Sequence, residues 1–244
     1  DMMKHARYYH TATLLNDGSV LVVGGKNGSD NDGILATAEL YNPKTGKWTL
    51  AGALTIERAY HTASLLSDNE TVLVIGGFDN EKESIMNAEI YNSTTNSWTV
   101  IHNPMNVART HHTASVLSDG QVLVTGGYDT IDDYDPILKS SELLDLSTQM
   151  WTKTTDALEI SRIGHTMSKL NNGQVLVVGG QAFVFGELPE TEGQPLDRME
   201  IYDPQARRWS TSPALMTQKR TGHTATVLPY QSVLVVGGVI DKDN

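Results

Sequence analysis

Short apolar runs recur along the chain at a nearly constant spacing. The run Val20-Leu-Val-Val is followed by Gly24-Gly25, and the same kind of run ends in Gly-Gly four more times. A β-branched apolar run of this length is typical of a strand that is buried on both faces. No stretch longer than one turn follows the 3.6-residue period of a helix, so the pattern predicts β-structure with almost no helix.

Each apolar run belongs to a longer repeated segment that begins near a histidine. The segments occupy residues 9–25, 60–77, 111–127, 164–180 and 222–238, and their histidines are separated by 51, 51, 53 and 58 residues. Within a segment, a turn such as Asn16-Asp-Gly joins two strands, and its composition predicts a two-residue hairpin loop with positive φ. The aligned histidines are His10, His61, His112, His165 and His223.

A second pattern lies between these segments. It starts with a glutamate two residues before a Tyr or Leu, and it reaches a Trp seven residues after that Tyr or Leu. Its four copies run from Glu39 to Trp48, from Glu89 to Trp98, from Glu142 to Trp151 and from Glu200 to Trp209. The pattern predicts two further strands in each unit, which gives four short strands a unit.

A repeated four-stranded unit of about 50 residues, with Gly-Gly, Tyr and Trp at fixed offsets, resembles the kelch repeat. The resemblance implies an all-β fold, a kelch-type β-propeller, with about four and a half four-stranded blades in one domain over residues 1–244. The units span approximately 7–57, 58–108, 109–161, 162–219 and an incomplete 220–244. It also implies that the first strand of each blade is innermost and that Tyr and Trp fill the space between neighbouring blades.

The two ends of the sequence suggest a piece of a larger propeller, such as one of six blades. Five inner hairpins stand against only four outer ones, and a closed propeller needs equal numbers. Met3 stands four residues before Arg7, as Leu54 stands four before Arg58. We therefore expect Asp1–Ala6 to be the link that follows the outer strand of another blade.

Composition narrows the range of partners. The chain has 18 Lys and Arg against 29 Asp and Glu, a formal net charge of −11, which disfavours nucleic acid as a partner. It has no cysteine, so these residues form no disulfide and hold no thiolate metal ligand. No apolar run approaches the roughly 18 residues of a membrane span. No signal peptide is visible, and both a cytoplasmic and a secreted location stay open.

Residues that recur in every unit are expected to serve the fold. A ring of the five histidines around a metal is the alternative, but facing inner strands are too far apart for them to share one ion. The recurring arginines and glutamates are expected to form charge pairs within the scaffold, although an arginine at a loop mouth is also suited to an acidic ligand.

Residues that occur once are better candidates for function. Between Gly-Gly and the glutamate of the third strand lie 13, 11, 14 and 19 residues, and these loops differ sharply. In kelch propellers, ligands usually dock on the face formed by these loops and the links between blades. We therefore expect a non-catalytic interaction module that binds a protein or glycan there and needs no cofactor. The candidate contacts are Tyr8, Tyr9, Tyr60, Phe78, Asp79, His111, Tyr128, Asp129, Phe183 and Phe185. For the two phenylalanines of the longest loop, burial within the loop itself is an equal alternative.

An enzymatic alternative comes from a second resemblance. Galactose oxidase and related copper radical oxidases carry a kelch-type propeller and bind copper in part through an adjacent Tyr-His pair. This chain has such a pair at Tyr9-His10 and again at Tyr60-His61. Imidazole and phenolate suit copper. The pair is repeated, however, and the cysteine that cross-links to the radical tyrosine in that family is absent, so the interaction module is the preferred hypothesis.

Overall fold

The computed structural model describes residues 1–28, 33–131, 136–182 and 193–240. They form two compact units, the first of residues 1–110 with 129–131 and the second of residues 111–128 with 132–244. Within the described residues the structure is all-β except for one 3-10 turn, η1 (Pro229–Gln231). No helix in this part of the chain is long and apolar enough to cross a membrane.

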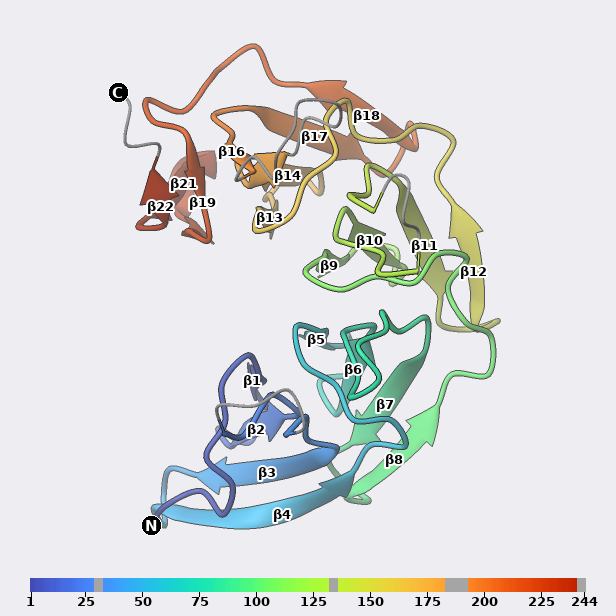
Figure 1. Ribbon diagram of the computed structural model, residues 1–244, viewed down its shortest axis with the longest axis vertical. Coiled ribbons are helices and arrows are strands. Elements are labelled where there is room, and N and C mark those ends of the chain that lie inside the picture. Colours follow the sequence, from blue (N-terminus) through green and yellow to red (C-terminus); the bar gives the residue numbers. More distant parts are fainter. Residues whose placement is uncertain (29–32, 132–135, 183–192, 241–244) are drawn as a thin grey trace. The chain divides into compact units, whose positions relative to one another are not determined.

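Unit 1 contains two four-stranded antiparallel sheets, in which the strands lie side by side in chain order (Figure 1). The first consists of β1 (Thr11–Leu14), β2 (Val20–Val23), β3 (Thr37–Asn42) and β4 (Lys47–Ala53). The second consists of β5 (Thr62–Leu65), β6 (Thr71–Ile75), β7 (Ala88–Asn92) and β8 (Ser97–Val100). We call these sheets blades 1 and 2.

Unit 2 contains two sheets of the same kind and several short ones. Blade 3 consists of β9 (Thr113–Val116), β10 (Val122–Thr125), β11 (Ser141–Asp145) and β12 (Met150–Lys153). Blade 4 consists of β13 (Thr166–Lys169), β14 (Val175–Val178), β17 (Met199–Asp203) and β18 (Arg208–Thr211). The hairpin of β20 (Thr224–Val227) and β21 (Val233–Val236) supplies two strands of a fifth. Two further pairs are β15 (Gln181–Ala182) with β16 (Gln194–Pro195), and β19 (Arg220–Thr221) with β22 (Val239–Ile240).

The strand registers repeat from blade to blade and confirm the predicted four-stranded unit. In blade 1, Thr11 directly follows the repeated His10 and begins β1, and it pairs with Val23, the last residue of β2. Thr62, Thr113 and Thr166 pair in the same way with the last residue of the second strand of their blades. In blades 1, 2 and 4 the Tyr of the third strand pairs directly with the Trp of the fourth, and the ring centroids are 5.0–5.2 Å apart. These cross-strand aromatic pairs explain why Trp falls seven residues after Tyr.

The core lies along the second strands and between adjacent blades. The apolar residues of β6, β10 and β14 are buried along their whole length or nearly so, as expected for strands covered on both faces. In unit 1, Tyr91 of blade 2 packs in one cluster with Leu21, Val23 and Ala51 of blade 1. The indole of Trp98 donates a hydrogen bond to the carbonyl of Ala51, at 2.8 Å. The Tyr and Trp therefore fill the space between these two blades, as predicted.

The hairpin loops differ from the predicted two-residue form. The amide of Leu15 donates to the carbonyl of Ser19, and the amide of Gly18 donates to the carbonyl of Leu15, which makes a three-residue loop. Only its last residue, Gly18, has positive φ (86°). This is the type I turn followed by a left-handed residue that three-residue hairpins use. Asn69 holds the equivalent position in blade 2 at φ 59°.

The Gly-Gly pairs stand where the backbone of the preceding inter-blade link passes close by. A Cβ placed on Gly25 meets the carbonyl oxygen of Tyr8 at 2.6 Å and the Cβ of His10 at 2.9 Å, and Gly25 has φ 91°. No side chain fits there without displacing backbone. The second glycine is therefore a requirement of the fold, and it brings the link against the end of the second strand.

Candidate functional site

The repeated histidines join neighbouring blades. In unit 1, Nε2 of His61 lies 2.8 Å from Oγ1 of Thr11 on the preceding blade. The same bond joins Thr113 to His165 at 2.7 Å and Thr166 to His223 at 2.9 Å. Burial, and then the charge of the neighbouring Arg58 or Arg162, lower the pKa of His61 and of His165 to about 3. The predicted structural role is confirmed for these histidines.

The repeated arginines and glutamates form buried pairs. Nη2 of Arg58 lies 2.8 Å from Oε1 of Glu89, and Nη1 donates to the carbonyl of Gly76 at 2.8 Å. The carboxylate of Glu89 also accepts hydrogen bonds from the amides of Thr55 (2.9 Å) and Ile56 (3.4 Å), which precede the arginine. The same network joins Arg7 to Glu39 and Arg162 to Glu200. The Nη atoms of these arginines and the carboxylates of these glutamates are hydrogen-bonded within the scaffold, so the predicted structural role is confirmed for these three pairs.

The residue just before the repeated histidine has a left-handed backbone in every unit. Glycine holds this position in two units, at Gly164 (φ 63°) and Gly222 (φ 64°). In the other three it is held by Tyr9 (φ 56°), Tyr60 (φ 55°) and His111 (φ 54°). A non-glycine residue in this region costs roughly 1–2 kcal/mol. Large side chains therefore occupy a backbone position that favours glycine, and such strain concentrates at functional sites.

Three of the predicted tyrosines form one aromatic cluster on unit 1. The ring of Tyr9 stacks on that of Tyr60, with centroids 4.1 Å apart and an interplanar angle of 28°. The ring of Tyr8 meets that of Tyr9 edge-on at 4.7 Å. The amide of Tyr60 donates to the carbonyl of Tyr9 at 3.2 Å, which ties the two links together. Tyr8 and Tyr9 are 40% and 51% exposed, so the cluster presents its outer rings to solvent.

A lysine that the sequence analysis did not select lies beneath this cluster. Lys26 is 9% exposed, and its Nζ lies 5.6 Å from the centroid of the Tyr60 ring and 5.2 Å from that of Phe78. Both distances are in the range of a cation–π contact. Burial raises the pKa of Tyr60, with hydrogen bonding to Tyr9 as the next cause, so its phenol is neutral. Lys26 and Phe78 hold equivalent positions after Gly-Gly, which was the signal available in the sequence.

Two of the predicted aspartates accept hydrogen bonds from loop residues of unit 1. Oδ1 of Asp79 accepts a hydrogen bond from the amide of Glu83 at 3.0 Å. Oδ1 of Asp129 accepts from the hydroxyl of Ser84 at 2.9 Å and from the amide of Ile131 at 3.0 Å. Both carboxylates therefore hold loops of unit 1 in place, and these hydrogen bonds already occupy one oxygen of each.

The other predicted contacts belong to unit 2. His111 is exposed and left-handed, and Tyr128 is half-buried and forms a β-bridge with Ile137. Phe183 and Phe185 lie outside the described residues, so neither alternative for the longest loop is tested. The structure brings together Tyr8, Tyr9, Tyr60 and Phe78, and it adds Lys26 to them.

Nothing in the described geometry favours a copper site at the two Tyr-His pairs. Nε2 of His61 is bonded to Thr11, and His61 itself is buried. Burial, and then the charge of Arg7, lower the pKa of His10. Across the described parts of the chain, no three His, Cys, Asp or Glu side chains gather as metal ligands would.

Repeated four-stranded blades that carry Gly-Gly, a paired Tyr and Trp, and a buried Arg–Glu pair define a kelch-type β-propeller. Comparison with known families agrees: residues 9–238 match the KLHDC2/KLHL20/DRC7 Kelch-repeats domain, and the chain belongs to that kelch-repeat family. Among 368 matching chains of solved structures, that of YjhT gives a TM-score of 0.71 at 18% identity, covering 96% of this chain and 73% of that one. At this identity the likeness shows the fold alone. No curated protein matches the chain.

Proposed function

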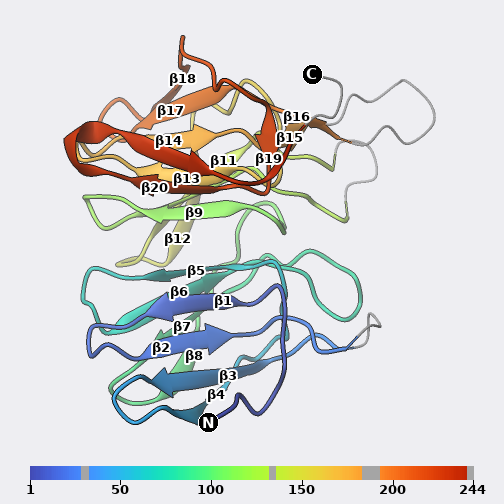
Figure 2. The same ribbon diagram turned by 90° about the vertical axis from the view of Figure 1, so that its left-hand side faces the viewer.

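We propose that this chain is a non-catalytic interaction module that binds a protein or glycan partner through the loop face of unit 1. We use "loop face" for the end of the blades where the β2–β3 and β6–β7 loops meet the links before β1 and β5 (Figure 2). The observation that carries the proposal is the stacked pair of Tyr9 and Tyr60, both held at positive φ, with Tyr9 half exposed.

This cluster lowers the stability of the free protein. Exposed aromatic rings gain little from solvent, and the left-handed backbone beneath them favours glycine. Tyrosine offers a partner a large apolar face with a polar hydroxyl and little side-chain entropy to lose, which makes it a frequent anchor in interfaces. Fixing the links by the Tyr60–Tyr9 backbone hydrogen bond holds the rings in place before a partner arrives.

The charge around the cluster refines the expected ligand. Lys26 places a buried ammonium behind the rings of Tyr60 and Phe78, although the chain as a whole carries a net charge of −11. Among the described residues, no carboxylate is within ion-pair distance of Lys26. A partner that presents an aromatic or apolar group flanked by an acceptor is therefore favoured at this site.

The test is a ligand selection followed by substitution at the cluster. The chain is screened on a peptide display library and on a glycan array, and each ligand obtained is measured against Tyr9→Ala, Tyr60→Ala and the control Tyr230→Ala. Tyr230 is 97% exposed and lies in η1 of unit 2, so it is not one of the residues that form the loop face of unit 1. We expect a loss of roughly tenfold or more for the cluster variants and none for the control. Ligands that bind all three variants as they bind the parent chain contradict the proposal.

A further inference from the structure

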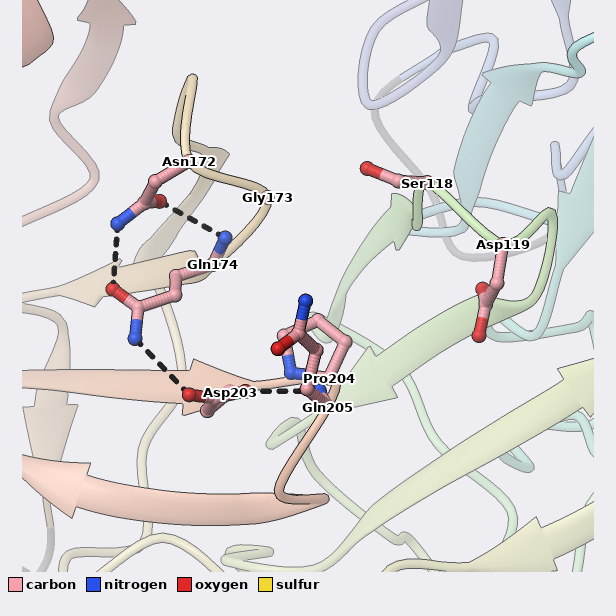
Figure 3. Close-up of a pocket in the computed structure, with 8 residues that line it drawn as sticks. All are labelled: Ser118, Asp119, Asn172, Gly173, Gln174, Asp203, Pro204 and Gln205. Atoms are coloured by element: carbon pink, nitrogen blue, oxygen red, sulfur yellow. Dashed lines mark hydrogen bonds between the residues drawn. The ribbon is translucent and has the colours of Figure 1, made fainter.

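A second concave site lies on unit 2, at the hairpin-turn end of its blades. The cavity has a volume of about 570 Å³, within the range of small-ligand sites. Its walls are the hairpin turns of blades 3 and 4 and the turn between β17 and β18 (Figure 3). The lining residues are Ser118, Asp119, Asn172, Gly173, Gln174, Asp203, Pro204 and Gln205. This end of the blade is opposite the end that carries the β14–β17 loop.

The corresponding turns of blade 2 are closed by hydrogen bonds that blade 4 cannot make. In blade 2, Ser93 donates both its amide (3.0 Å) and its hydroxyl (2.8 Å) to the carbonyl of Glu70. Blade 4 has Pro204 at the position of Ser93, and proline has neither an amide hydrogen nor a hydroxyl. The turn between β17 and β18 is therefore not joined to the hairpin turn by its backbone, and the space between them stays open.

The buried hydroxyl of Tyr202, the residue before Asp203, lacks the partner that its counterpart has in blade 2. Tyr91 of blade 2 donates a hydrogen bond to Oδ1 of Asn96 at 2.9 Å. In blade 4 the position of Asn96 is taken by Arg207, which is exposed, and the hydroxyl of the fully buried Tyr202 has no hydrogen-bond partner. Burial raises the pKa of Tyr202, Arg207 lowers it, and Asp119 and Asp203 raise it. The hydroxyl therefore lies within electrostatic range of two carboxylates that line the cavity.

The polar groups of the cavity are held in fixed orientations. The side-chain amide of Gln174 donates to Oδ2 of Asp203 at 3.3 Å, and its carbonyl accepts from Nδ2 of Asn172 at 2.8 Å. Oδ1 of Asp203 accepts from the amide of Gln205 at 2.9 Å. Figure 3 shows these bonds along one wall, with Ser118 on the other. Such a network presents its remaining donors and acceptors in a defined array.

The chemistry of this array selects the ligand class. Carboxylates only accept hydrogen bonds, side-chain amides both donate and accept, and hydroxyls do both. Among the described residues that line the cavity there is no lysine, arginine or histidine, which disfavours an anion. We propose that this cavity binds a neutral polyhydroxyl ligand, a mono- or disaccharide, whose hydroxyls pair with Asp203, Gln205 and Ser118. The site is separate from the loop face and does not depend on the function proposed there.

The test is an NMR titration of the full ¹⁵N-labelled chain with glucose, galactose and maltose. Titration to about 50 mM covers the expected range, because a ligand of this size binds with a Kd on the order of millimolar. We expect saturable shifts at the amides of the three turns, 118–121, 172–175 and 203–206. The double variant Pro204→Ser/Arg207→Asn installs the blade 2 residues, a serine donor and an asparagine acceptor for Tyr202, and it is expected to weaken binding roughly tenfold or more.

Matched variants separate the site from the fold. Gln205→Ala is expected to weaken binding, whereas Thr94→Ala, at the equivalent position of blade 2, is expected to leave it unchanged. Unchanged amide shifts elsewhere in the unit that carries the substitution show that each variant is folded. The proposal is overturned if no sugar gives saturable shifts at these turns, if the closing double variant binds as the parent does, or if calcium chloride shifts these amides and the sugars do not.

Discussion

Oγ1 of Thr11 on blade 1 lies 2.8 Å from Nε2 of His61 on blade 2. The imidazole is buried, and its pKa is about 3, against an ordinary value of 6.5. The folded chain therefore keeps His61 neutral at a pH where the unfolded chain protonates it. His165, bonded to Thr113, behaves in the same way in unit 2.

Stability is expected to fall with acid at a pH where carboxylates are still ionised. Because both histidines have folded pKa values below the unfolded value, their contribution is complete above about pH 6.5 and declines as the pH falls toward 3. Each adds a slope of up to about 1.4 kcal/mol per pH unit in that interval. Urea unfolding at several pH values between 4.8 and 6.5 measures the slope. In His61→Gln the number of protons taken up on unfolding should be smaller by up to one. An unchanged slope would show that the pKa of His61 is the same in the folded and the unfolded chain.

Removal of one member of a buried Arg–Glu pair is expected to destabilise the fold strongly. Arg58→Ala leaves the carboxylate of Glu89 without its cation and the carbonyl of Gly76 without a donor, at an expected loss of about 3–5 kcal/mol. The control is Arg208→Ala, because Arg208 is exposed and its Nε lies 3.8 Å from Asp156, a geometry that contributes little. Denaturant midpoints compare the two, and equal losses would refute the structural role of Arg58.

The second glycine of the Gly-Gly pair should not tolerate a side chain. Gly25→Ala places a methyl group 2.6 Å from the carbonyl oxygen of Tyr8, at φ 91°, so backbone must move. Gly46→Ala is the matched control, since Gly46 also has positive φ (68°) but open space around its Cβ position. We expect about 1 kcal/mol of destabilisation for Gly46→Ala and a loss of several times that for Gly25→Ala, measured by thermal or urea unfolding.

The strain at Tyr9 can be measured apart from its ring. Tyr9→Ala and Tyr9→Gly both remove the stacking on Tyr60, but only alanine retains a Cβ at φ 56°. Tyr9→Gly should therefore be more stable than Tyr9→Ala by about 1 kcal/mol, even though glycine has more conformational entropy when unfolded. The two free energies of unfolding decide this, and an alanine variant that equals or exceeds the glycine variant would show that the position carries no strain.

The blades could be read from the sequence because their residues obey local rules. The pairing of Tyr91 with Trp98 and the burial of the Val-Leu-Val runs follow from spacing and apolar character, and so did the structural roles of His61 and Arg58. The hairpin loops were predicted one residue too short. Asn16-Asp-Gly suits both forms of turn, and the choice depends on which residues close the ladder.

The candidate site was only partly predictable from the sequence, because no single motif defines it. Its residues stand out only when the repeated units are compared with one another. Tyr8, Tyr9, Tyr60 and Phe78 stood out as aromatics on links and loops, but Lys26 did not, since its place under two rings depends on how the loops fold. The cavity beside Pro204 could not be foreseen at all. In blade 2 the corresponding turns are joined by the hydrogen bonds of Ser93, which Pro204 cannot make, and this difference is visible only when the two blades are compared.

The glutamate of each third strand also sets which parts of the chain can change length. Glu39 accepts the amides of Lys4 and His5 together with the guanidinium of Arg7. Glu89 and Glu200 each bind two backbone amides and the arginine of their own links in the same way. The number of residues between those amides and the arginine is therefore fixed by one carboxylate. An inserted residue there would separate the arginine from the amides. In the described parts of the loops after Gly-Gly, no third-strand glutamate fixes the length in this way, and these loops already differ in length between blades. A foreign peptide is therefore best grafted there.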